Sequence, residues 1–80
     1  MNQNLNQKII DRLQVENNLK WGRFIYNLTQ NELALKSGIS QGRISMLENG
    51  FVLPNDDERG RLAKALGCES DELIFELKKD

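Results

Sequence analysis

The amino-acid sequence predicts an all-α fold, and two observations support this prediction. Apolar residues recur at three- and four-residue spacings through most of the 80-residue chain. Residues that favour helix starts and stops, chiefly Ser, Thr, Asn and Gly, stand between these segments. The only strand-like segment, Phe51-Val52-Leu53, is too short for a strand and is bounded by a glycine and a proline. We therefore expect one domain of residues 1–80, built from helices and short loops.

The first helical segment spans residues 5–26. Asn17 and Asn18 are poor helix formers, so the pattern leaves open whether this segment is one helix or two. Asn27 is expected to end it, because Asn tolerates the left-handed conformation found at helix ends. The apolar stripe of this segment consists of Leu5, Ile9, Ile10, Leu13, Val15 and Leu19.

The later helices have recognisable first residues. Thr29 and Glu32 have the spacing of a capping box, and Ser40 is expected to cap the following helix. Asn55 begins a fourth helix, and Ser70 a short fifth one that carries Leu73, Ile74 and Leu77. The acidic residues Asp56, Asp57 and Glu58 suit the positive end of a helix dipole better than a metal site. The glycines expected to end helices are Gly38, Gly50 and Gly67.

Composition excludes several classes of function. Histidine is absent and Cys68 is the only cysteine, which excludes an internal disulfide and a cysteine-based zinc site. The chain also has no glycine-rich phosphate loop and no nucleophile elbow, so we expect no enzyme, no cofactor and no metal. The first residues lack the order of a signal peptide, and no apolar run approaches the ~20 residues of a membrane span. We expect a cytoplasmic protein.

The charge is distributed unevenly along the chain. The net charge is −1, which is unusual for a nucleic-acid binder. Residues 17–49 nevertheless carry four positive residues against two acidic ones, whereas residues 50–80 carry five against eight. The middle of the chain is therefore the part suited to facing phosphates, although the asymmetry is mild.

Residues 30–49 have the pattern of a bihelical corner. Two helices that cross steeply need a small residue where they touch, and Ala34 supplies it. The tight turn needs a residue with positive φ, which Gly38 supplies four residues later. Ile39 is expected to lie beneath the turn, and Ile44 and Leu47 to point inward from the second helix. The agreement of these positions predicts a helix-turn-helix.

Roughly residues 15–75, which include this stretch, resemble the Cro and phage-repressor (XRE-type) helix-turn-helix family. The resemblance implies a five-helix repressor-like bundle, with a short N-terminal helical extension (1–14), a family core (15–67) and a C-terminal helix (68–80). It also implies a sequence-specific double-stranded DNA-binding transcription regulator. The matching motifs are Leu28-Thr29-Gln30-Asn31-Glu32-Leu33-Ala34, Ser37-Gly38-Ile39-Ser40, Ile44-Ser45, Glu48-Asn49-Gly50, Pro54 and Leu62-Ala63 with Ala65-Leu66.

The resemblance assigns roles to individual residues. Gln41 is the best candidate for base reading, because a Gln amide can bond N6 and N7 of adenine together. Arg43 is expected to bind a guanine or a phosphate, and Met46 to touch a thymine methyl. Arg23 and Glu48 match an ion pair inside relatives, so they are expected to be structural. The remaining DNA-facing positions are Thr29, Gln30 and Asn49 at phosphates, and Ser40, Gly42 and Ser45 along the recognition helix.

Several residues have ordinary structural interpretations or depart from the family pattern. Trp21 and Tyr26 are expected in the core, and Cys68 as a small, partly buried residue. Gly42 has no side chain where many relatives read a base. Phe51, Val52 and Leu53 replace the commonly basic stretch after the Asn-Gly, and Phe24 and Ile25 add two apolar residues at the end of the first helical segment; these additions suggest a further buried contact.

These residues predict a homodimeric repressor that reads a palindromic operator. The alternative is an antitoxin or another protein-interaction module that binds a partner, with a toxin or RNA polymerase as the possible protein partner. A helix-turn-helix that no longer binds DNA is a third alternative, which the acidic balance supports. The residues expected at the dimer interface are Phe51, Val52, Leu53, Leu73, Ile74, Phe75 and Leu77.

Overall fold

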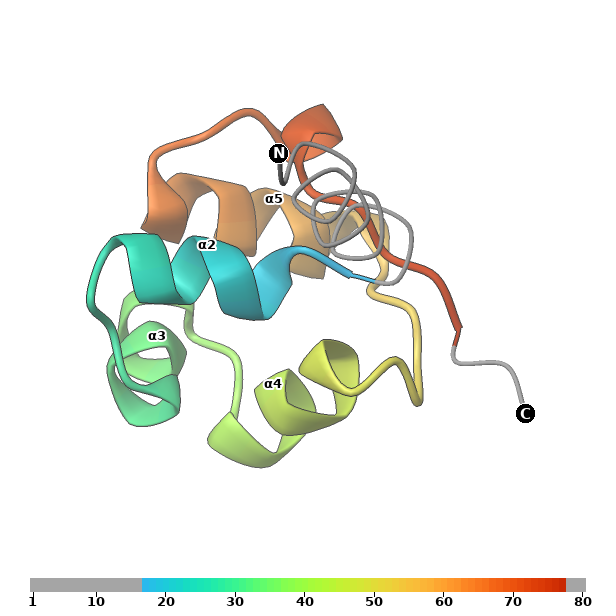
Figure 1. Ribbon diagram of the computed structural model, residues 1–80, viewed down its shortest axis with the longest axis horizontal. Helices are drawn as coiled ribbons and strands as arrows, with labels where there is room; N and C mark the ends of the chain where they lie inside the picture. The colour runs from blue at the N-terminus through green and yellow to red at the C-terminus, as the bar shows by residue number, and fades with distance from the viewer. Residues whose placement is uncertain (1–16, 78–80) are drawn as a thin grey trace, which may run out of the picture.

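Four α-helices and one 3₁₀ turn account for the regular structure of residues 17–77, the part of the chain that this computed structural model describes. The all-α prediction is confirmed for that part, which contains no strand, but the expected count of five α-helices is not. The N-terminal extension, 1–14, lies outside the described residues. In chain order and with the labels of Figure 1, the elements are α2 (Leu19–Ile25), α3 (Gln30–Ser37), α4 (Gln41–Glu48), α5 (Asp56–Leu66) and η1 (Ser70–Glu72).

The predicted capping residues define the helix ends. The Thr29 hydroxyl accepts a hydrogen bond from the Glu32 amide at 3.1 Å, and the Thr29 amide donates to Glu32 Oε1 at 2.8 Å, which completes the predicted capping box of α3. These bonds hold the pKa of Glu32 below its ordinary value. Asn55 and Glu58 form a second capping box at the start of α5. Asn27, expected to end the first helix, has a φ of 56°.

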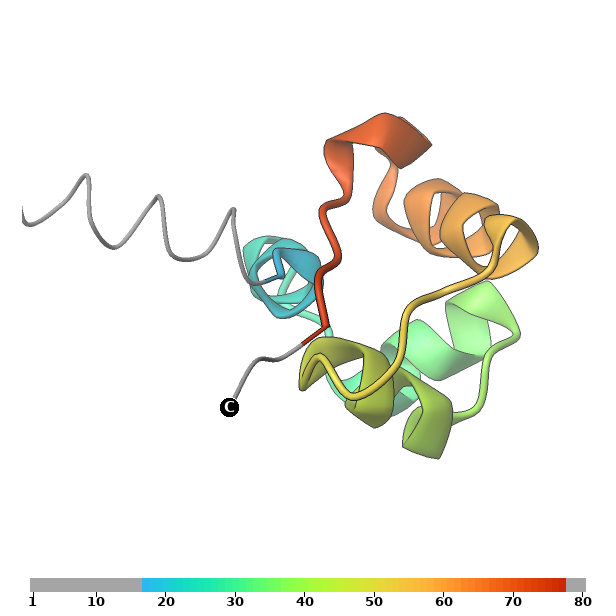
Figure 2. The ribbon, with the colours of Figure 1, turned by 90° about the vertical axis from the view of Figure 1, so that its right-hand side faces the viewer.

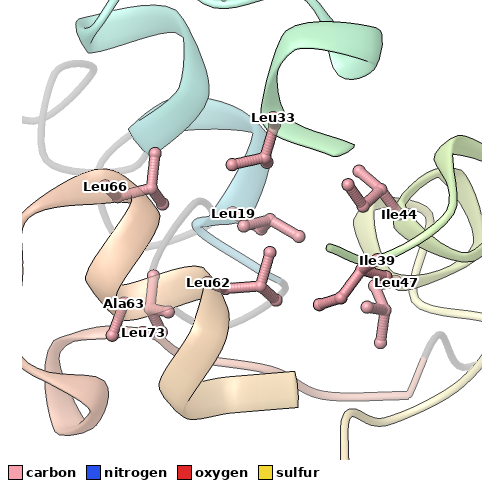
Figure 3. Packing of buried hydrophobic residues seen from close by; sticks show 9 residues of the cluster. All are labelled: Leu19, Leu33, Ile39, Ile44, Leu47, Leu62, Ala63, Leu66 and Leu73. Atoms are coloured by element: carbon pink, nitrogen blue, oxygen red, sulfur yellow. The ribbon is translucent and has the colours of Figure 1, made fainter. Parts of the chain in front are cut away.

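The core lies between α5 on one side and the α3–α4 pair on the other. Figure 3 shows Leu19 of α2 in the middle of this core, between leucines of α5 and residues of α3 and α4. α3 packs against both α4 and α5, and α2 packs against α4. The buried apolar residues are Leu19, Leu33, Ile39, Ile44, Leu47, Leu62, Ala63, Leu66 and Leu73.

The prediction of a C-terminal helix is wrong for the described residues. Only the single turn η1 forms there, after Glu69 rather than Ser70, and the chain then runs past the start of α2 (Figures 1 and 2). Asn18 accounts for the difference. Its side-chain Oδ1 accepts a hydrogen bond from the Ile74 backbone amide at 2.8 Å, and its backbone amide donates to the Ile74 carbonyl at 3.2 Å. An isolated antiparallel bridge joins Asn17 to Phe75. Long-range partners therefore satisfy backbone groups that a helix would have paired locally.

Trp21 and Tyr26 are not core residues, contrary to the sequence prediction. Their exposed fractions are 51% and 55%. Leu19 and Arg23, one turn apart, occupy the inward face of α2 and leave Trp21 on the opposite face. Cys68 is partly buried as expected, and burial raises the pKa of its thiol.

Candidate nucleic-acid interface

The corner between α3 and α4 has the geometry that its sequence predicts. Gly38 ends α3 with a φ of 74°, and its amide donates to the Ala34 carbonyl at 2.8 Å. A Cβ at Gly38 would lie 2.9 Å from Nη1 at the end of the half-exposed Arg61 side chain, which can move aside, so the requirement for glycine comes from the positive φ. Ile39 is buried beneath the turn, next to the fully buried Ile44, and Leu47 is also fully buried. The two helices therefore pack into a corner whose outer side remains open.

A buried ion pair holds α4 against α2. Arg23 Nε lies 2.7 Å from Glu48 Oε2, and Arg23 Nη2 donates to Glu48 Oε1 at 3.1 Å. Arg23 Nη1 donates to the Leu28 carbonyl at 2.9 Å. The two side chains are only 9% and 2% exposed. Both residues are therefore structural, in agreement with their expected role.

A chain of side-chain hydrogen bonds leads from this ion pair to the surface. Gln30 Nε2 donates to Glu48 Oε1 at 2.9 Å, and Gln41 Nε2 donates to Gln30 Oε1 at 2.7 Å. The bond to Gln30 uses one of the two N–H groups of the Gln41 amide. Adenine recognition requires the amide oxygen and one N–H, so the groups that this bond does not use are sufficient for it. The Gln41 amide is thus oriented before any ligand binds. The sequence indicated both glutamines separately but gave no sign of the bonds that join them.

The outward side of α4 is uncharged and open. Gln41 and Gly42 are exposed, Met46 is 43% exposed and Ser45 is half-buried. An added Cβ at Gly42 would meet nothing within 4 Å. This surface offers amide, hydroxyl and thioether groups on one side of the helix, which are groups that can contact base edges.

Three predicted contact residues lie at the ends of α3 and α4. Thr29 and Ser40 are exposed, and each uses its side-chain oxygen to cap its helix. Asn49 is exposed after α4, and its Nδ2 donates to the Ser45 carbonyl at 2.8 Å. All three are therefore exposed at helix ends, and hydrogen bonds within their own caps fix their orientation.

Arg43 does not extend freely from α4, as a guanine or phosphate contact would require. Its Nε and Nη2 donate to the two carboxylate oxygens of Glu58 at 2.8 and 2.9 Å, and Nη2 also donates to the Leu53 carbonyl at 3.4 Å. The hydrogen bonds from Arg43 hold the pKa of Glu58 below its ordinary value. Sequence reasoning missed this pair, because the two residues belong to different helices and share no periodic pattern.

The residues expected at a dimer interface divide into exposed and buried ones. Phe51, Leu53 and Leu77 are 61%, 48% and 51% exposed. Val52 and Phe75 pack partly against the core. The Leu73 side chain, at 3% exposed, belongs to the core and is unavailable to a partner. The half-buried residue Ile74 is fixed through its backbone by Asn18.

Two further features of residues 17–77 bear on the kind of site. No cluster of three or more His, Cys, Asp or Glu side chains gathers there in a form that could hold a metal ion. None of the helices in this range has the length and apolar character needed to cross a membrane.

Comparisons with known proteins identify the family to which this chain belongs. A family model described as helix-turn-helix matches residues 26–73. The chain is 34% identical over 61 residues to an uncharacterised HTH-type transcriptional regulator of Methanocaldococcus jannaschii, a match that covers 76% of this chain and 92% of the relative. No solved structure matches. The chain belongs to the Cro/C1-type helix-turn-helix family of DNA-binding transcription regulators.

Proposed function

We propose that this chain regulates transcription by placing α4 in the major groove of a specific double-stranded DNA site. The observation that carries the proposal is the hydrogen-bonded chain from buried Glu48 through Gln30 to Gln41. It presents an oriented amide at the N-terminal end of the helix that, in helix-turn-helix proteins, contacts base edges. An amide held in place before binding loses less conformational freedom when it meets its base.

The proposed contacts divide into those that position the protein and those that read sequence. The N-terminus of α3, with Thr29 and Gln30, and the exposed amide of Asn49 bind phosphates. Gln41 reads an adenine, and Met46 contacts a thymine methyl. The open space around Gly42 allows the duplex to approach the α4 backbone closely. Ser40 and Ser45 supply hydroxyl groups along the same side of α4.

We propose further that two copies bind together as a homodimer. Two-fold symmetry would place two α4 helices in successive major grooves ~34 Å apart, so the operator would be palindromic. Support comes from the exposed apolar side chains of Phe51, Leu53 and Leu77, on the side of the molecule where the loop after α4 and the C-terminal segment both run (Figures 1 and 2). The simplest mode of action is repression by occluding polymerase. Activation through contact with RNA polymerase is the other mode that this geometry allows.

Selection of bound duplexes from a random pool, followed by affinity measurements on the selected site, tests this proposal. Gln41→Ala is expected to weaken binding by about 1–3 kcal/mol and to relax base choice at one position. Gln30→Ala is expected to weaken binding to every duplex, because it removes a phosphate contact, and to relax base choice less than Gln41→Ala does, because it releases the Gln41 amide without removing it. Equal, sequence-independent losses for both variants would contradict base reading by Gln41.

A second candidate function is binding of a partner protein, as an antitoxin does. The outward face of α2 supports it, because Trp21, Phe24 and Ile25 lie at helical spacing and are 51%, 54% and 60% exposed. Co-expression with the product of an adjacent gene tests this function. A complex that W21Q/I25Q disrupts without reducing the thermal stability of the free protein would favour it, and a complex indifferent to these substitutions would contradict a role for this face.

A further inference from the structure

A second ion pair joins the start of α4 to the start of α5. Arg43 and Glu58 meet through two parallel hydrogen bonds of 2.8 and 2.9 Å. Glu58 also accepts a hydrogen bond from the Asn55 amide at 3.0 Å, as part of its capping box. The side chains of Arg43 and Glu58 are 35% and 14% exposed, so the carboxylate is the more enclosed partner.

This pair neutralises the charge that α4 would otherwise bring to DNA. Arg43 is the only Lys or Arg in α4, and it follows directly after Gly42 on the exposed side of the helix start. A free guanidinium in that place would bind the phosphates of any duplex, because its paired N–H groups match a phosphate as well as they match a carboxylate. Such a contact adds affinity for every sequence alike.

The surroundings of Glu58 favour retention of the pair. Its carboxylate is held by the capping box of α5 as well as by Arg43, and Arg43 is held by the Leu53 carbonyl as well as by Glu58. A phosphate that captured Arg43 would leave a largely enclosed carboxylate without its cation, which is a costly arrangement. The neighbouring acid Asp57 is engaged by Arg61 at 2.8 Å and does not compete for Arg43.

We propose that Glu58 withholds Arg43 from the duplex and so limits the sequence-independent part of DNA binding. The pair lowers affinity for all DNA sequences equally and leaves discrimination to the uncharged side chains of α4. This inference rests on the proposed DNA-binding function and deepens it. Arg43 is then a positioning residue that ties α4 to α5, and it does not contact phosphate in the wild-type complex.

The test compares the salt dependence of DNA binding in Glu58→Gln, the double variant R43Q/E58Q and a matched control, Asp56→Asn. Asp56→Asn makes the same change in net charge beside Glu58 without releasing Arg43. Fluorescence anisotropy gives the association constant of each variant for a selected duplex and for a scrambled one. Thermal unfolding followed by circular dichroism shows whether each variant is folded at the binding temperature.

The slope of log K against log salt is expected to be steeper by about one in Glu58→Gln than in Asp56→Asn. This difference is the value for one added phosphate contact. Glu58→Gln is also expected to raise affinity for the scrambled duplex by at least the same factor as for the selected one. R43Q/E58Q is expected to restore the wild-type slope, because the intact pair contributes no phosphate contact.

Two results would overturn the inference. One is a Glu58→Gln slope equal to that of Asp56→Asn. The other is a double variant whose slope is shallower than wild type by about one, because Arg43 would then bind a phosphate in the wild-type complex. Failure of the proposed DNA-binding function can be told apart from failure of this inference, because in the first case the wild type would bind neither duplex. In that case, acquisition of salt-dependent binding by Glu58→Gln would still support withholding of Arg43, and its absence would overturn it.

Discussion

Individual side chains in this protein act mainly through their partners. The Arg23–Glu48 pair illustrates this, because both side chains are nearly inaccessible and Glu48 also accepts a hydrogen bond from Gln30. A buried charge without its partner is strongly destabilising. The ion pair therefore supports the fold of α2 against α4 and, through Gln30, the orientation of Gln41.

Loss of either charge of this pair is expected to destabilise the protein substantially. Arg23→Met leaves the Glu48 carboxylate buried with no cation, and we expect a loss of about 3–5 kcal/mol in the free energy of unfolding. Urea denaturation measures it. The control is R23M/E48L, which removes both charges and is expected to be more stable than Arg23→Met alone. A double variant less stable than Arg23→Met would contradict this account of the pair.

The stability of the protein is also expected to depend on pH through Glu58. Hydrogen bonds from Arg43 lower the pKa of Glu58 in the folded state, so on acidification the unfolded chain binds a proton before the folded one does. The stabilisation from this pair is therefore complete above the ordinary glutamate pKa and is lost as the pH falls through the lowered value. Denaturation from pH 7 to pH 3 should show a larger loss for wild type than for Glu58→Gln. Parallel pH profiles would contradict it.

At the residue scale, the sequence identified the outward groups but not their connections. The resemblance placed Gln30 and Gln41 on the outward side and paired Glu48 with Arg23 inside the protein, because each of these residues matches a fixed position of the family motif. The Arg43–Glu58 pair was not predicted, since 15 positions and a loop separate its members. Trp21 was wrongly predicted to lie in the core, because the α2 positions that face inward are occupied by Leu19 and Arg23.

At the scale of elements, the helix-turn-helix depends on the conformation of a single turn. Gly38→Ala is expected to lower the free energy of unfolding by about 1–2 kcal/mol, because alanine would have to adopt the left-handed backbone conformation of this turn. Gly60 is the matched control. It lies inside α5 with nothing within 4 Å of an added Cβ, so Gly60→Ala is expected to stabilise by about 0.5–1 kcal/mol. Thermal unfolding of both variants checks the contrast, and equal effects would contradict the role assigned to the turn.

Helix starts and stops were predictable from sequence because they depend on nearest neighbours. The capping box at Thr29, the helix start at Asn55 and the left-handed glycines Gly38 and Gly67 are local features, and each lies where the sequence indicated it. The C-terminal segment was not predictable in this way. Its conformation depends on hydrogen bonds to Asn18, which lies 56 positions from Ile74, and long-range partners of this kind override local helix preference.

At the scale of the whole molecule, the proposed dimer can be tested by sedimentation equilibrium. Wild type is expected to self-associate, and the double substitution F51S/L53S to remain monomeric, because it removes two exposed apolar side chains from the proposed interface. L35S is the control, since Leu35 is 86% exposed on α3, outside that interface. A wild type that stays monomeric well above the concentrations needed for DNA binding would contradict the homodimer.

The central claim is that the outward side of α4 contacts double-stranded DNA. Amide chemical-shift mapping by NMR, with a duplex carrying the selected site, tests it most directly. We predict that the largest changes occur at Thr29, Gln30 and the residues of α4 from Gln41 to Met46, with little change over the outward face of α2. Changes confined to α2 or α5, with the amides of α4 unmoved at saturation, would contradict the account.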